Sequence, residues 1–144
     1  MRQAISHLEV FPLIKSTLLA IAISYSLLAP AAGASDIYLH LVSKHFLTEA
    51  DYNEVNPGIG YVQDKITTGV YKNSLGRLST YLGAEFKYSN VGVNVGGVTG
   101  YRYAVSPMIA GFVDVGIFRV TMLPVAEDLN GIRGFAVGLS IKIK

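Results

Sequence analysis

Residues 78–97 read LSTYLGAEFKYSNVGVNVGG, and this stretch decides the fold class. In its first half the even positions are mostly apolar or aromatic and the odd positions are mostly small or polar. Val91, Val93 and Val95 repeat the pattern after Ser89-Asn90. Alternation with a period of two gives a β-strand one apolar and one polar face, and Ser-Asn is turn chemistry. The stretch therefore predicts two strands joined by a tight turn.

The same alternation recurs along the chain after residue 35, with turn sequences between the runs, and no helical pattern of three turns interrupts it. The expected strands are 36–46, 57–64, 66–73, 78–88, 91–101, 108–115, 116–123 and 133–143. Short connections between them favour antiparallel pairing. Because closure removes exposed sheet edges, we expect an all-β fold, an eight-stranded antiparallel up-and-down β-barrel.

The alternation leaves open which face of the barrel points outward. An apolar outer face would make it a membrane barrel, and the reverse would make it a lipocalin-like soluble barrel. Glycines crowd the non-apolar face, where they either open space for a chain-like ligand or allow close packing of neighbouring strands. These glycines are Gly92, Gly96, Gly97, Gly100, Gly134 and Gly138.

Residues 1–34 carry the features of a secretory signal peptide. Arg2 and Lys15 precede the apolar run 16–28, and small residues follow up to Ala34. Thirteen apolar residues span about 20 Å as a helix, short of the ~30 Å hydrocarbon core of a bilayer. We expect cleavage after Ala34 and a single barrel domain over residues 35–144.

Composition excludes several classes of protein. The chain has no Cys, which rules out disulfides and thiolate metal sites. Twelve basic and ten acidic residues give a net charge of +2 without basic clusters, which argues against nucleic acid as a partner. His40 and His45 are five residues apart, so a regular strand would place them on opposite faces, unable to share a metal ion. We expect a monomer without metal or cofactor.

Two stretches carry functional polar residues at strand ends. His45 lies near the end of the first expected strand, and Asn73-Ser74 ends the third. A His that takes a proton from an attacking hydroxyl, with hydroxyl or amide donors for the oxyanion, is the chemistry of acyl transfer. On spacing alone, a solvent-exposed His and an Asn-Ser turn are the more common explanations of the same residues.

The order of motifs resembles the PagP-like family of lipid A palmitoyltransferases. Asp36-Ile37-Tyr38 is followed by His45, as in the first strand of that family. Tyr52-Asn53-Glu54 then precedes a Gly-rich strand, and Gly69-Val70-Tyr71 leads to Asn73-Ser74, where the family has Asp-Ser. A Gly-rich strand, a Pro-containing link, a strand ending in aliphatic-Pro and a final alternating strand follow in the family's order: 91–100, Pro107, 118–124 and 135–143.

The resemblance implies an outer-membrane barrel that moves a palmitoyl chain from a phospholipid onto lipid A. It implies that His45 and Ser74 are the functional His and Ser, with Asn73 in the place of the Asp. Asn carries no charge but can orient a His by hydrogen bonding. Two alternatives stay open: a non-catalytic lipid- or small-ligand-binding barrel of the periplasm or outer membrane, and a structural outer-membrane barrel. All three interpretations imply export. A lipid or acyl chain is the expected partner, except for the structural barrel, which has no ligand.

Overall fold

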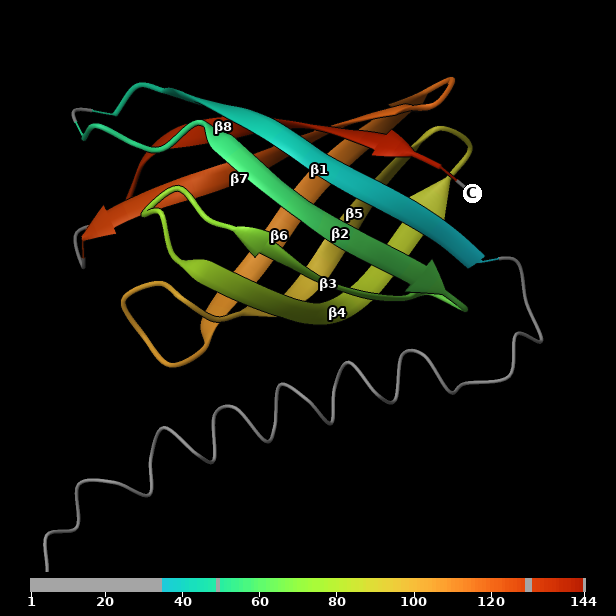
Figure 1. Cartoon of the computed structure of the whole chain (residues 1–144), viewed down its shortest axis with the longest axis horizontal. Helices are drawn as coiled ribbons and strands as arrows, with labels where there is room; N and C mark the ends of the chain where they lie inside the picture. Colours follow the sequence, from blue (N-terminus) through green and yellow to red (C-terminus); the bar gives the residue numbers. More distant parts are fainter. Residues whose placement is uncertain (1–34, 49, 129–130, 144) are drawn as a thin grey trace, which may run out of the picture. The chain divides into compact units, whose positions relative to one another are not determined.

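The computed structural model describes residues 35–48, 50–128 and 131–143, and the predicted signal peptide 1–34 lies outside them. Eight strands follow one another along this part of the chain. They are β1 (Ser35–Phe46), β2 (Val55–Gln63), β3 (Ile66–Lys72), β4 (Leu78–Tyr88), β5 (Val91–Val98), β6 (Ser106–Val115), β7 (Phe118–Asp128) and β8 (Gly131–Lys142). Each strand pairs antiparallel with its sequence neighbours, and β1 pairs with β8 (Figure 1). The predicted eight-stranded antiparallel barrel is confirmed.

The two ends of the barrel differ in the length of their connections. At one end, two-residue turns join the strands, and Asp64 and Lys65 both have positive φ, at 48° and 72°. Positive φ at both central positions suits the right-handed twist of the flanking strands. At the other end, longer segments follow β1, β3 and β5. We call this end the loop rim and define it by residues 47–54, 73–77 and 99–105.

Several strands have different bounds from those expected, and two prolines explain part of the difference. Pro57 lies inside β2, where the β1–β2 register shifts and before the β2–β3 pairs begin. Pro124 lies inside β7, beyond the last β6–β7 pair at Met122. In both places the ladder on one side is interrupted, so the missing N–H breaks no hydrogen bond there.

Side chains alternate between the outside and the inside of the barrel, and the apolar set points outward. Large apolar side chains on the outer wall are 37–64% exposed: Leu39, Ile59, Ile66, Leu82, Phe86, Val95, Ile109, Val113, Phe118 and Met122. Polar side chains on the inward positions are buried: Asn56, Thr67, Ser79, Glu85, Arg119 and Ser140. The question that the sequence left open is therefore answered: the apolar face of the barrel is its outer face.

Three of the interior glycines make room for aromatic rings. A Cβ added at Gly60 or Gly69 would collide with the hydroxyl end of Tyr81, and one added at Gly92 would collide with the ring of Phe112. Gly138 differs, because the nearest atom to its added Cβ lies 3.8 Å away. Close packing thus accounts for Gly92, whereas Gly138 borders looser space.

The two histidines of β1 lie on the same face, contrary to the expectation that they face opposite sides. The register of β1 against β8 shifts between His40 and Val42. His40 pairs with Ser140 and His45 pairs with Ala136, and these β8 residues are both buried and four positions apart. A bulge adds one residue to a strand, which reverses the alternation beyond it. His40 and His45 therefore both face inward.

Candidate functional site

His45 lies on the inner side of the loop rim, packed against the segment that connects β1 with β2. Its ring stacks on Tyr52, with centroids 4.3 Å apart and planes 25° apart. Its Nδ1 is buried and has no hydrogen-bond partner in the described structure. A buried polar atom without a partner carries an energetic cost, and such atoms often belong to functional sites. His45 is thus a ring held in place by stacking, with one nitrogen unoccupied.

Asn73 is fully buried, and its carboxamide makes four hydrogen bonds. Nδ2 donates to Ser79 Oγ at 2.8 Å and to the Gly100 carbonyl at 3.0 Å. Oδ1 accepts from the main-chain N–H groups of Leu75 and Arg77, both at 2.9 Å. The amide therefore holds the β3–β4 loop in shape and ties it to the β5–β6 loop. None of its hydrogen bonds goes to His45.

Ser74 follows Asn73 and is half-buried. Its carbonyl accepts a hydrogen bond from the Asn53 N–H at 2.8 Å. Its hydroxyl has no hydrogen-bond partner in the described part of the chain. The fixed neighbour Asn73 therefore places a free hydroxyl on the loop rim.

Asn53 and Asn56 link the loop that carries Tyr52 to the loop that carries Ser74. Asn53 Nδ2 donates to the carbonyls of Val55 at 2.7 Å and Asn73 at 3.3 Å. Asn56 Nδ2 donates to the carbonyls of Asn53 at 3.3 Å and Lys72 at 3.1 Å. The linked loops place His45, Asn73 and Ser74 on one rim. In the described residues no hydrogen bond or ring contact joins His45 directly to Asn73 or Ser74.

Glu54 lies beside the same rim but on the outer wall. The Lys44 ammonium contacts its carboxylate at 2.8 Å and 3.0 Å. The hydrogen bond from Lys44 holds the pKa of the Glu54 carboxyl below its usual value. The three residues of the Tyr52-Asn53-Glu54 motif thus have different contacts. The tyrosine stacks on His45, the asparagine hydrogen-bonds to the loop that carries Ser74, and the glutamate pairs with Lys44 on the outer wall.

The interior holds a charged cluster that sequence reasoning missed. The Arg119 guanidinium donates to Glu85 at 2.7 Å and 3.3 Å and to Asp114 at 2.7 Å and 3.0 Å. Lys87 Nζ donates to Asp114 at 2.6 Å. We call Glu85, Lys87, Asp114 and Arg119 the ion-pair plug. These residues occupy the polar positions of the alternating strands. Opposite charges at such positions on different strands are the sequence signal that could have revealed the cluster.

Two aromatic rings enclose the centre of this plug. The Arg119 guanidinium carbon lies 4.1 Å from the Tyr38 ring centroid and 3.8 Å from that of Phe112, within the range of cation–π contacts. Tyr38 comes from β1 and Phe112 from β6. Side chains from β1, β4, β6 and β7 therefore meet inside the barrel.

His40 belongs to a second interior layer between the plug and the loop rim. Its ring nitrogens contact Ser140 Oγ at 2.9 Å and the Tyr81 hydroxyl at 3.0 Å. Tyr71 lies beside it in edge contact, 5.9 Å between centroids, and meets the Tyr101 hydroxyl at 3.1 Å. Both nitrogens of His40 have hydrogen-bond partners, whereas the buried Nδ1 of His45 has none in the described structure.

No model of a protein family matches the sequence, and no curated protein matches it either. Across residues 35–48, 50–128 and 131–143, no group of three or more His, Asp or Glu side chains could hold a metal ion. None of the described segments forms a helix with the length and apolarity needed to cross a bilayer. The geometry of the barrel and its rim is therefore the basis for a functional proposal.

Proposed function

We propose that this chain is an exported barrel that spans the outer membrane and transfers an acyl chain from a phospholipid to lipid A or a related lipid. The observation that carries the membrane placement is the orientation of the side chains. Buried charges such as Arg119 and Glu85 lie inside, whereas large apolar side chains such as Leu82 and Ile109 lie outside. A membrane barrel needs this arrangement, because lipid cannot solvate polar groups.

Strand length supports the same placement. A tilted strand needs about 9–11 residues to cross a bilayer. Six of the strands have 9 to 12 residues, while β3 has 7 and β5 has 8. The signal pattern predicted in residues 1–34 would supply export.

The filled interior of the barrel favours a reaction at the loop rim over transport of solutes through the barrel. The ion-pair plug and the rings of Tyr38 and Phe112 occupy the lumen with residues from several strands. Side chains that fill a small barrel leave no aqueous channel. The unoccupied polar groups, His45 Nδ1 and the Ser74 hydroxyl, lie on the loop rim, where lipid headgroups would meet the protein.

The transfer step assigns one role to each of these two groups. The acceptor hydroxyl attacks the ester carbonyl of the donor phospholipid while His45 takes its proton. The Ser74 hydroxyl donates a hydrogen bond to the resulting oxyanion. The intermediate collapses to the new ester and a lysophospholipid, whose alkoxide recovers the proton from His45. Asn73 acts by positioning, because its four hydrogen bonds hold the segment that carries Ser74.

Cell fractionation tests the membrane placement. The full chain, expressed in a bacterium with an outer membrane, is expected in the outer-membrane fraction and should need detergent for extraction. Recovery in the aqueous periplasmic fraction without detergent would refute it.

A lipid A acylation assay tests the chemistry, with purified protein in mixed micelles and a radiolabelled phospholipid donor. His45→Ala should lower the rate by about 10²–10⁴, the usual contribution of a general base. Ser74→Ala should lower it by a smaller factor, and Asn90→Ala on the opposite rim serves as the matched control. Equal rates in wild type and His45→Ala exclude the catalytic role. Retention of lipid without turnover in the wild type would favour the non-catalytic lipid-binding barrel.

A further inference from the structure

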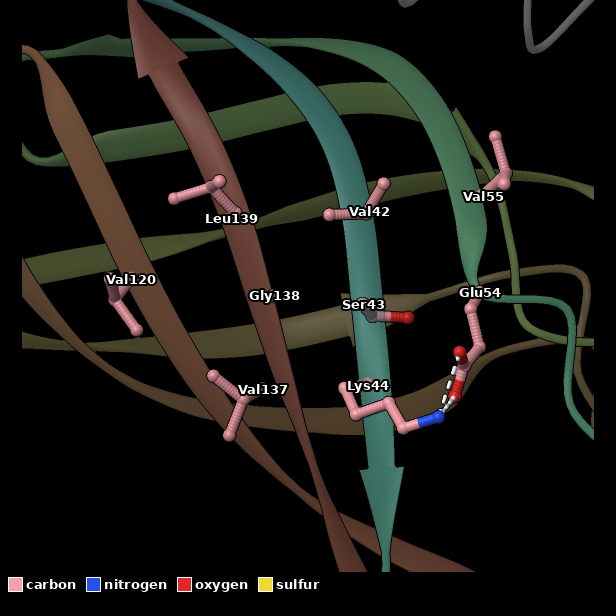
Figure 2. Close-up of a pocket in the computed structure, with 9 residues that line it drawn as sticks. All are labelled: Val42, Ser43, Lys44, Glu54, Val55, Val120, Val137, Gly138 and Leu139. Atoms are coloured by element: carbon pink, nitrogen blue, oxygen red, sulfur yellow. Dashed lines mark hydrogen bonds and ion pairs between the residues drawn. The ribbon is translucent and has the colours of Figure 1, made fainter.

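A shallow groove of about 510 Å³ runs over the outer wall, across β2, β1, β8 and β7 (Figure 2). The strand register explains its apolar floor. Val55 pairs with Val42, Val42 with Leu139, and Leu139 with Val120, so four apolar side chains form one row across four strands. Three of the four are valines, which project less far from the wall than neighbouring aromatic residues.

Two aromatic side chains lie on β1 and β8 beyond the groove, on the side of the loop rim. Phe46 of β1 pairs with Phe135 of β8, and their rings stack with centroids 5.1 Å apart and planes 17° apart. In membrane proteins, aromatic residues concentrate at the level of the lipid headgroups. In the membrane placement proposed above, the Phe46–Phe135 pair would belong to the aromatic girdle at one interface.

Among the described residues that line the groove, the charged ones are Lys44 and Glu54, and they pair with each other. The ammonium and carboxylate lie 2.8 Å apart, and their side chains are 63% and 40% exposed. Figure 2 shows the pair beside the row, next to Val42 and Val55. Exposed ion pairs contribute little net energy, so an arriving ligand can separate them easily. The groove thus offers one cation and one anion next to an apolar strip.

We propose that this groove docks a zwitterionic phospholipid with a primary ammonium headgroup, of the phosphatidylethanolamine class. One acyl chain lies on the row of Val55, Val42, Leu139 and Val120. The phosphate contacts Lys44, and the headgroup ammonium donates to Glu54. The proposal rests on the membrane placement under the proposed function and is independent of the acyl-transfer step.

Charge complementarity selects this lipid class over two common others. An anionic phosphatidylglycerol would satisfy Lys44 but place no cation against Glu54. A phosphatidylcholine presents a positive charge, but its trimethylammonium group has no N–H to donate to the carboxylate. The primary ammonium meets both requirements.

Native mass spectrometry tests the proposal on the full-length mature barrel. The protein is reconstituted in nanodiscs of equimolar phosphatidylethanolamine, phosphatidylglycerol and phosphatidylcholine, and the retained lipids are counted after release. The wild type should retain phosphatidylethanolamine about fivefold over phosphatidylglycerol. Glu54→Gln should shift the preference toward phosphatidylglycerol, because it leaves Lys44 as an unpaired cation.

A groove-filling variant separates the apolar contact from the charges. Val42→Phe should reduce retention of all three lipids, whereas Val95→Phe, at an equally exposed position on β5, should not; the two valines are 46% and 44% exposed. Circular dichroism and heat-modified gel mobility check that both variants fold.

The outcomes distinguish this proposal from the one on which it rests. Reconstitution with equal retention of the three lipids by wild type and variants overturns the groove and leaves the membrane placement intact. Equal loss in Val42→Phe and Val95→Phe also overturns the groove. Failure of the folded wild type to enter nanodiscs or to float with vesicles overturns both.

Discussion

Replacing Asn73 with aspartate tests the physical account of the loop rim most sharply. The change introduces the aspartate that the PagP-like family, which the sequence resembles, carries at this position. It replaces only the side-chain NH₂ group with an oxygen. The structure predicts that Asn73→Asp destabilises the barrel, because the amide at this position acts as a donor. Nδ2 donates to Ser79 Oγ and to the Gly100 carbonyl, and a carboxylate can donate to neither.

Ser79 cannot compensate by turning its own proton toward the new carboxylate. Its hydroxyl already donates to the Thr99 carbonyl at 2.5 Å. The change therefore loses two hydrogen bonds of about 1 kcal/mol each and leaves the Gly100 carbonyl without its donor, for another 1–3 kcal/mol. We expect a loss of about 3–5 kcal/mol in the free energy of unfolding at neutral pH.

Guanidinium-induced unfolding in detergent micelles measures this difference, followed by circular dichroism and tyrosine fluorescence, since the chain has no Trp. Asn90→Asp, at an exposed turn, is the matched control and should change the unfolding free energy by less than about 0.5 kcal/mol. At pH 4 the Asn73→Asp defect should shrink by about 1 kcal/mol, because a protonated carboxyl regains one donor. Wild-type stability of Asn73→Asp at neutral pH would refute this account of the loop rim.

Two further predictions concern the interior. Arg119→Met should lower the unfolding free energy by about 3–5 kcal/mol, since it leaves the buried Glu85 carboxylate without its partner. Lys142→Met is the control: it breaks a more exposed pair with Asp36 and should lower the unfolding free energy by no more than about 1 kcal/mol. An equal effect of both changes, measured by denaturant titration, would contradict the importance of the plug. Gly60→Ala should cost about 1–3 kcal/mol, because its Cβ meets the Tyr81 hydroxyl. Partial recovery of stability in Gly60→Ala combined with Tyr81→Phe would support this collision as one cause, beside the contact of the added Cβ with His40 Nε2.

The alternation of residues predicted the eight strands and their closure, because a period of two is a local property of a strand. Which face of the barrel points outward could not be predicted, since an apolar face packs equally well against lipid or against a barrel core. The buried charges decide it in the structure. Arg119, Glu85 and Asp114 come from separate strands, and only the barrel register brings them together.

The candidate site shows the same limit. His45 and Ser74 were predicted from their strand-end positions, and the structure places both on the loop rim. The inward orientation of His45 depends on the bulge after His40, and no local sequence pattern predicts this bulge. The four hydrogen bonds of Asn73 depend on Gly100, which lies 27 residues away along the chain and is brought close by the β3–β4–β5 pairing.

The membrane-facing orientation of the apolar wall is the central claim, and site-directed spin labelling tests it most directly. Because the chain has no Cys, single cysteines can be introduced without background labelling. Labels at the outward positions 82, 95 and 109 and at the inward positions 94 and 121 are compared in vesicles, with molecular oxygen and a water-soluble nickel complex as relaxing agents. We predict high oxygen accessibility at the outward positions and low oxygen accessibility at the inward ones. Outward labels that the water-soluble nickel complex reaches as readily as oxygen does would contradict the account.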